Sequence, residues 1–194
     1  MTLTVAVLVF EDAAEMDIVG PIQVLAAARP GEGEALRILT VSLDGGEVSC
    51  ESGLRILSDR TLDELAQPDI LLIPGGSGAL RAAEDPRILA WLAACGPGCR
   101  TLATVGCGAF PLVAAGLAAG HCITTHPAQV ASLRVLGGAE VVEGVRFLCD
   151  DRLLSCTGAA AAVDMGLWLV EQLHGEVAVE RVRHTIAPVS EALH

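Results

Sequence analysis

Apolar runs of strand length alternate with segments of helical periodicity along this chain, and this order constrains its fold more than any other feature. The runs at residues 3–10, 69–76 and 101–105 are typical of buried strands, being short, rich in Val, Ile and Leu, and bounded by turn residues. A helical pattern follows each run, at residues 17–28, 79–94 and 109–118. This alternation predicts an α/β fold with a doubly wound, mostly parallel sheet, helices on both faces, and ligands at the carboxyl ends of the strands.

Length and composition predict one domain spanning residues 1–194. A chain of 194 residues that is 52% hydrophobic can bury one large core and is short for two. Aromatic residues make up only 3% of the chain, so small branched side chains must fill that core. Such a core suits a parallel sheet covered by Ala-rich helices.

The remaining segments predict shorter elements. Asp44-Gly45-Gly46 is a turn signal after an expected strand at residues 36–43, and Asp85-Pro86 predicts a break within the helical segment that contains it. Thr61 and Glu64 have capping-box spacing and predict a brief helix. The other expected elements are a hairpin at residues 47–50 and 54–57, a strand at 123–126, a helix at 129–136, a hairpin within 145–156, and helices at 159–173 and 177–186.

The charge of the chain argues against nucleic acid and membrane partners. The formal net charge is −12, which repels a phosphate backbone, and no basic cluster offsets it. The uncharged stretch at residues 101–120 contains Pro111 and four glycines, so a strand, a turn and a buried helix explain it better than a membrane span. The N-terminal segment lacks the pattern of a signal peptide. We therefore expect a cytoplasmic protein.

Seven cysteines lie in the sequence, an odd number for a domain too large to need disulfides. Cys95 and Cys99 have no second Cys/His pair at zinc spacing, so we interpret them as small buried thiols. Residues 73–78 lack the Gly-Lys-Ser/Thr of a phosphate loop. No metal and no cofactor is predicted.

Gly106, Cys107 and Gly108 separate the expected strand at residues 101–105 from the helix that follows, which makes this junction very sharp. Such an elbow exposes a side chain above the sheet beside a helix N-terminus, where the pKa of a thiol is expected to be lowered. Because the thiolate is the nucleophilic form, Cys107 is a candidate for covalent catalysis. The alternative is that Cys107 is a small apolar filler like the other cysteines.

Six short motifs occur in a characteristic order and spacing over nearly the whole chain. They are Phe10 to Pro21, Ile73-Pro74-Gly75-Gly76, Val105 to Phe110, Ala114 to Leu117, Thr124-Thr125-His126 and Thr157-Gly158. Together they resemble the ThiJ/PfpI superfamily, whose fold is flavodoxin-like and class I glutamine amidotransferase-like, and especially its isocyanide hydratase branch. The resemblance implies that fold and a catalytic cysteine at the elbow.

The chain departs from the superfamily pattern at the nucleophile. When residues 108–110 and 124–126 are held in register without a gap, Gly106 occupies the usual cysteine position and Cys107 follows it. Glycine adopts the strained backbone of such an elbow at little cost, so the turn is kept and the thiol is displaced. The direction of the Cys107 side chain, into the packing or along the pocket wall, then decides the mechanism.

The resemblance assigns roles to further residues near the strand ends. Asp17 matches the acid that hydrogen-bonds the reactive thiol in the isocyanide hydratase branch, although an acid at a helix start also complements the dipole. Gly75 and Gly76 resemble oxyanion donors to which Gly108 contributes, although Pro-Gly-Gly is also a common strand terminator. His126 is expected mainly to shape the pocket wall and a dimer edge. The four other histidines are expected on the surface, namely His121, His174, His184 and His194.

Three functions are compatible with these residues. The first is hydration of an N-substituted isocyanide to an N-formamide through Cys107, with Asp17 orienting or activating water. The second is a non-catalytic small-molecule-binding or sensor protein, because Gly106 replaces the usual nucleophile. The third is glyoxalase or deglycase activity on α-oxoaldehydes, for which the superfamily usually has Glu where this chain has Asp17. The resemblance also implies a homodimer, for which the apolar helices would supply the interface.

Overall fold

The computed structural model describes residues 2–28 and 34–186, so His194 lies outside the described residues. A seven-stranded sheet has the order β10-β11-β7-β6-β1-β2-β5, and its neighbouring strands are parallel except for the antiparallel pair β10 and β11. Its strands are β1 (Thr2–Leu8), β2 (Ala35–Ser42), β5 (Arg60–Thr61), β6 (Ile70–Ile73), β7 (Thr101–Val105), β10 (Phe147–Asp150) and β11 (Leu153–Cys156). The expected doubly wound, mostly parallel sheet is confirmed.

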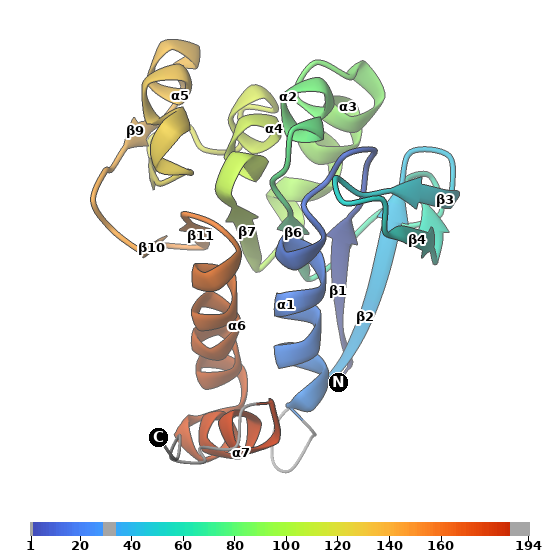
Figure 1. Cartoon of the computed structure of the whole chain (residues 1–194), viewed down its shortest axis with the longest axis vertical. Helices are drawn as coiled ribbons and strands as arrows, with labels where there is room; N and C mark the ends of the chain where they lie inside the picture. The colour runs from blue at the N-terminus through green and yellow to red at the C-terminus, as the bar shows by residue number, and fades with distance from the viewer. Residues whose placement is uncertain (1, 29–33, 187–194) are drawn as a thin grey trace.

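Helices cover both faces of this sheet, as expected. On one face α1 (Glu15–Ala27) lies beside α6 (Ala159–His174), and α7 (Glu176–Ile186) packs across the end of both (Figure 1). On the other face α4 (Ala109–Ala114) packs against β6 and β7 and contacts the remaining two helices of that layer, α2 (Gly78–Ala82) and α3 (Pro86–Cys95). The uncharged stretch that begins at residue 101 is thus a strand, a turn and a short helix.

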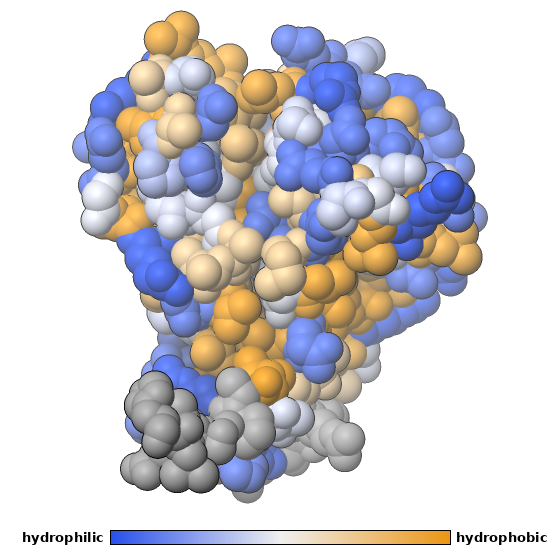
Figure 2. All heavy atoms as spheres, in the orientation of Figure 1, coloured by the Kyte–Doolittle hydropathy of each residue, from blue (hydrophilic) through white to orange (hydrophobic). Residues whose placement is uncertain are grey.

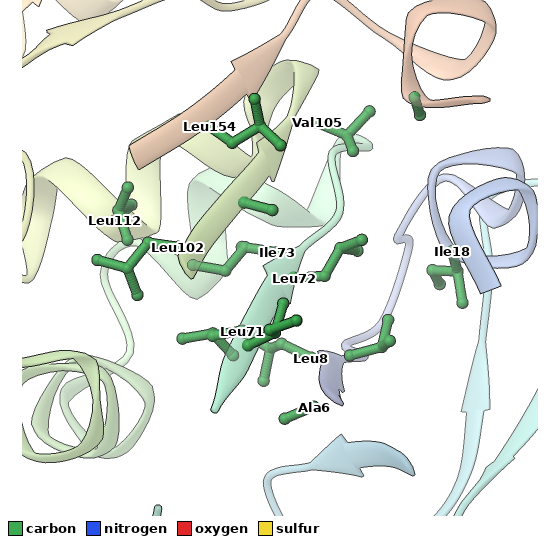
Figure 3. Close-up of a cluster of buried hydrophobic side chains, with 14 of the residues drawn as sticks. Ala6, Leu8, Ile18, Leu71, Leu72, Ile73, Leu102, Val105, Leu112 and Leu154 are labelled. Carbon is green, nitrogen blue, oxygen red and sulfur yellow. The ribbon is translucent and has the colours of Figure 1, made fainter. Parts of the chain in front are cut away.

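The core lies between the central strands and these helices. Leu71 and Ile73 of β6 are fully buried, as are Leu8 of β1 and Leu102 of β7, and their side chains gather in one cluster (Figure 3). Burial on both faces explains why these strands appear in the sequence as continuous apolar runs. The core fixes the strand ends in one layer, and the turns that follow β1, β6, β7 and β11 meet there.

Smaller elements surround the sheet. The expected first hairpin is present as β3 (Gly46–Ser49) paired with β4 (Arg55–Ser58), and β10 and β11 form the second. The expected helix break is also present, because Asp85 caps α3 by accepting hydrogen bonds from the N–H groups of Arg87 at 2.8 Å and Ile88 at 3.2 Å. Further elements are β8 (Cys122–Ile123), β9 (Glu140–Val141), α5 (Val130–Leu136) and the 3-10 turns η1 (Gly96–Gly98), η2 (Gly106–Gly108) and η3 (Pro127–Gln129).

Three expected elements are wrong in form. The reciprocal hydrogen bonds of Thr61 and Glu64 do form, at 2.9 and 3.3 Å, but they close a turn after β5 rather than start a helix. The strand expected at residues 123–126 is reduced to β8, which pairs with β9 outside the main sheet. The helix expected to reach residue 118 ends at Ala114, because a positive φ of 76° at Gly116 turns the chain away.

His174 also differs from expectation. Both of its ring nitrogens are buried and have no hydrogen-bond partner among the described residues. This burial, together with the Arg181 charge, lowers the pKa of the imidazole.

No helix within residues 2–28 and 34–186 is both long and apolar enough to cross a bilayer.

Candidate functional site at the strand-helix elbow

A cavity of about 470 Å³ lies at the carboxyl ends of the central strands. Its wall includes Asp17, Gly76, Gly106, Cys107 and His126, all predicted from the sequence. A larger cavity of about 770 Å³ lies between α1 and α7, away from the elbow and from these predicted residues. We therefore take the elbow cavity as the candidate site and call it the elbow pocket.

Asp17 lies in the first turn of α1 and is only 4% exposed. Its carboxylate Oδ2 accepts a hydrogen bond of 3.0 Å from the N–H of Gly75, in the turn after β6. Burial raises the pKa of Asp17 to about 6, the Gly75 hydrogen bond opposes the rise, and the negative charge of Glu51 adds to it. A carboxyl group with this pKa can accept or give a proton near neutral pH.

Gly75 has a different role from the one expected. Its N–H is donated to Asp17, so in this structure it does not point at a developing oxyanion. A Cβ on residue 75 would lie 2.7 Å from Asp17 Oδ2 and 2.8 Å from the carbonyl oxygen of Val105, which is too close for any side chain. Gly75 is therefore required for the close approach of β6, β7 and α1, and it orients the acid.

Gly108 also packs closely against backbone, in its case at the end of β6. A Cβ on Gly108 would meet the carbonyl oxygens of Ile73 at 2.2 Å and Pro74 at 2.7 Å, and the residue does not line the elbow pocket. Gly76 does line it and has a φ of 105°, a backbone conformation that only glycine adopts readily. Of the three glycines expected to form an oxyanion cradle, Gly76 is the one whose position fits that role.

Gly106 has the strained backbone expected of a nucleophile elbow, with a φ of 51°. A Cβ on this residue would have no heavy atom closer than 3.7 Å, and Asp17 Oδ2 would lie 3.8 Å away. Space for a side chain directed at the acid is therefore present at position 106, as the register argument predicts for the usual nucleophile.

Cys107 is half-buried and lines the elbow pocket, so its side chain follows the pocket wall rather than lying wholly inside the packing. The expected lowering of its pKa is wrong. Burial raises the pKa of the Cys107 thiol, and the negative charges of Asp17 and Glu51 raise it further. The helix that begins after the elbow is only six residues long, and burial is the largest cause of the raised pKa.

Thr125 and Ser155 hold the next segment against the elbow. The Thr125 hydroxyl donates to the carbonyl oxygen of Gly106 at 2.8 Å, and the N–H of Thr124 donates to Ser155 Oγ at 2.9 Å. His126 follows and is exposed at the pocket, where its Nδ1 accepts from the N–H of Ala128 at 3.3 Å. Of the Thr-Thr-His motif, His126 lies on the pocket wall, and the buried Thr125 has an anchoring role that the sequence did not reveal.

Two further groups near the elbow were not predicted. Glu51, in the turn between β3 and β4, lines the elbow pocket, and its carboxylate accepts a hydrogen bond from the N–H of Ser77. Cys156 ends β11 directly beside Val105 and is fully buried, which raises the pKa of its thiol to about 12. Cys156 is therefore a packing residue, whereas Glu51 is a second acid at the pocket.

Comparison with known proteins identifies the family of this chain. Residues 3–172 match the model of the DJ-1/PfpI family. The chain belongs to the DJ-1/PfpI family. This assignment confirms the resemblance to ThiJ/PfpI proteins and the flavodoxin-like class of the fold.

Three relatives illustrate the range of this family. The isonitrile hydratase of Pseudomonas putida is 29% identical over 175 residues, which are 90% of this chain and 74% of that protein. The HTH-type transcriptional regulator CdhR of Pseudomonas aeruginosa is 28% identical over 160 residues, and the match covers 82% of this chain but only 47% of the regulator. A solved ThiJ/PfpI family structure from Pseudomonas syringae has a TM-score of 0.89 at 27% identity, covering 98% of this chain and 78% of that one.

Proposed function

We propose that this DJ-1/PfpI protein hydrates an N-substituted isocyanide to an N-formamide in the elbow pocket. The observation that carries the proposal is the pairing of a buried carboxylate, Asp17, with a pocket-lining thiol, Cys107. The similarity to an isonitrile hydratase supports the same chemistry, since isonitrile and isocyanide name one functional group. The cavity of about 470 Å³ has the size of a small-molecule site.

In the proposed reaction Asp17 moves protons and Cys107 forms the covalent bond. The carboxylate takes the thiol proton as Sγ adds to the isocyanide carbon, and it returns that proton to the same carbon to give a thioimidate. Water then adds to this carbon and a proton passes to nitrogen. The C–S bond breaks, the sulfur regains a proton, and the formamide leaves with one water consumed.

The electrostatics support this division of roles. The thiol is largely neutral near pH 7 because its pKa is raised, so it needs a base to become a nucleophile. Asp17, with a pKa of about 6, is mostly ionised there and is a stronger base than an exposed Asp. We expect kcat/KM to rise with pH through about 6 as this carboxyl ionises.

The test is the conversion of an aryl isocyanide to its formamide, followed by absorbance and chromatography, with glyoxal as the alternative substrate class. Cys107→Ala and Asp17→Asn are each expected to lower kcat/KM by about 100-fold or more, the typical share of a nucleophile or general base. Cys149→Ala removes an exposed thiol on β10 and should leave the rate unchanged. Full turnover by Cys107→Ala contradicts the covalent route.

A second candidate function is small-molecule binding without turnover. It is favoured by Gly106 at the usual nucleophile position and by the raised pKa of the Cys107 thiol. Relatives that are transcriptional regulators, such as CdhR, are compatible with such a role. Calorimetric binding of the formamide by a sample that gives no product from the isocyanide in mass spectrometry supports this candidate over the first.

We also propose that the protein is a cytoplasmic homodimer. Apolar side chains gather over α1 and α6 on one face of the molecule (Figure 2), and Met16 and Val19 of α1 are 53% and 39% exposed. Burial of such a face stabilises a symmetric pair. Sedimentation equilibrium should give twice the chain mass of 19.9 kDa, and Val19→Glu should shift it toward the monomer.

A further inference from the structure

Acidic side chains outnumber basic ones on the wall of the elbow pocket. Asp17 and Glu51 are its two acids, and none of the described residues that line it is Lys or Arg. His126 is the one basic side chain of the wall, and it is exposed. A ligand in this pocket therefore meets two carboxylates and one imidazole, and the imidazole offsets the carboxylate charge only in part.

The two acids lie at different depths. Asp17 is 4% exposed and lies beside the elbow, whereas Glu51 is exposed and comes from the turn between β3 and β4. The main chain fixes that turn, because the N–H of Glu51 donates to the carbonyl oxygen of Ala13 at 3.1 Å. The Glu51 carboxylate is also held, since it accepts from the N–H of Ser77 through Oε1. Its position at the pocket mouth is thus built rather than incidental.

Three neighbouring acids form ion pairs, whereas Glu11 and Glu15 form none with the described residues, as Glu51 does, but do not line the elbow pocket. Asp44 pairs with Arg87 at 2.7 Å, Glu47 pairs with Arg55 at 3.0 Å, and Asp12 pairs with Arg81. Glu51 forms no ion pair with any residue in the described part of the chain. Its charge also reaches the reactive groups, because it raises the pKa of both Asp17 and Cys107. An unpaired charge that faces a cavity selects the charge of what enters.

We propose that Glu51 is a specificity-determining residue, which makes the elbow pocket prefer ligands with a cationic substituent to neutral ones, and neutral ones to anions. The inference rests on the proposed function, and within it the substrate class is an isocyanide whose N-substituent ends in an ammonium group. The isocyanide carbon lies against Asp17 and Cys107, and the ammonium lies at the pocket mouth beside the free carboxylate oxygen of Glu51.

The test uses three product analogues of similar size and different charge. They are N-(2-aminoethyl)formamide, a cation, N-propylformamide, which is neutral, and N-formylglycine, an anion. Calorimetric binding to the wild-type protein is expected to follow that order, with steps of about fivefold in Kd, the ratio that corresponds to ~1 kcal/mol for a partly exposed ion pair. The preference should shrink when salt is added, because the pair is open to solvent.

Glu51→Gln is the informative variant. The amide oxygen can still accept the hydrogen bond from Ser77, so the loop is expected to keep its place while the charge is lost. The variant should bind the cation about fivefold more weakly, the anion more tightly, and the neutral formamide as before. Glu47→Gln carries the same charge change on β3, outside the pocket wall, and should leave all three values unchanged.

The outcomes separate this inference from the proposed function. Binding of the neutral formamide with no charge order in the wild-type protein overturns the role of Glu51 and leaves the pocket assignment intact. An equal loss of charge order in Glu51→Gln and Glu47→Gln also overturns it, because the net charge of the molecule would then be the cause. Absence of binding by all three formamides overturns the proposed function and this inference with it.

Discussion

Gly106 shows how one residue separates the fold of the elbow from its chemistry. Its φ of 51° costs any other residue about 1–2 kcal/mol, yet the space beside it is open toward Asp17. Gly106→Cys is therefore expected to fold with a free energy of unfolding lower by about that amount. Because its Cβ would lie 3.8 Å from Asp17 Oδ2, the new thiol can reach the acid, and isocyanide turnover should rise by about tenfold or more.

Gly106→Ala is the control for this change. It carries the same backbone strain without a thiol, so urea denaturation should show a similar loss of stability and the assay no gain in turnover. Gly108→Ala provides the contrast, because its Cβ would lie 2.2 Å from the Ile73 carbonyl oxygen and should cost far more. Equal turnover in Gly106→Cys and Gly106→Ala would show that position 106 has no catalytic value.

Asp17 makes stability depend on pH. Its carboxyl ionises near pH 4 in the unfolded chain and at about 6 in the fold, so the folded state holds a proton that the unfolded state has lost between these values. The stability that Asp17 contributes is thus full below pH 4 and falls as pH rises to 6, by up to ~3 kcal/mol. Asp17→Asn should remove this slope and be the more stable protein at pH 7 while losing activity.

Urea denaturation at several pH values measures this effect. Asp63→Asn, at an exposed position, is the matched control and should keep the wild-type slope. If the wild-type protein gained stability relative to Asp17→Asn between pH 4 and 6, the predicted sign of the effect would be wrong.

At the scale of elements, the central strands could be predicted from the sequence because their apolar pattern follows from burial. Elements whose form depends on tertiary contacts could not. The central strands are buried on both faces, so their apolar runs were visible without a structure. Thr61 and Glu64 made the hydrogen bonds of a capping box, but no helical run followed, and β5 took Thr61 into the sheet edge. The spacing of Thr61 and Glu64 therefore predicted their hydrogen bonds but not the kind of element that contains them.

The candidate site follows the same division. Cys107 was predicted from the sharp strand-helix junction, whereas Asp17 and His126 were predicted from motifs that resemble those of the ThiJ/PfpI superfamily. Glu51 was missed because its place at the pocket depends on how the β3–β4 turn folds over the segment after β1, where it meets Ala13. The N–H of Gly75 was predicted to face an oxyanion, but it donates to Asp17. That partner is 58 residues away in the chain, so local sequence could not reveal it.

Thr125 joins the segment after β8 to the elbow, and its replacement should affect both the stability of the fold and the reactivity of Cys107. Thr125→Val keeps the shape of the side chain but leaves the Gly106 carbonyl oxygen without this donor, at a cost of about 1–2 kcal/mol. The rate of Cys107 alkylation should rise because the wall beside it loosens. Thr185→Val loses an exposed hydroxyl that bonds within α7 to Arg181 and should change neither quantity. An unaltered denaturation midpoint in Thr125→Val would show that this hydrogen bond is dispensable.

For the whole molecule, the net charge of −12 sets how stability responds to salt. Self-repulsion among 24 acidic and 12 basic residues disfavours the compact state, and salt screens it. At pH 7.5, raising NaCl from ~0.01 to ~0.3 M should increase Tm by roughly 2–4 °C, the shift that corresponds to ~1 kcal/mol in a chain of this size. Near the pI of about 4.7 the charges balance, so calorimetry at about pH 5 should find almost no salt effect. A salt effect equal at both pH values would mean that ion exclusion from the surface, and not the charge of the chain, is responsible.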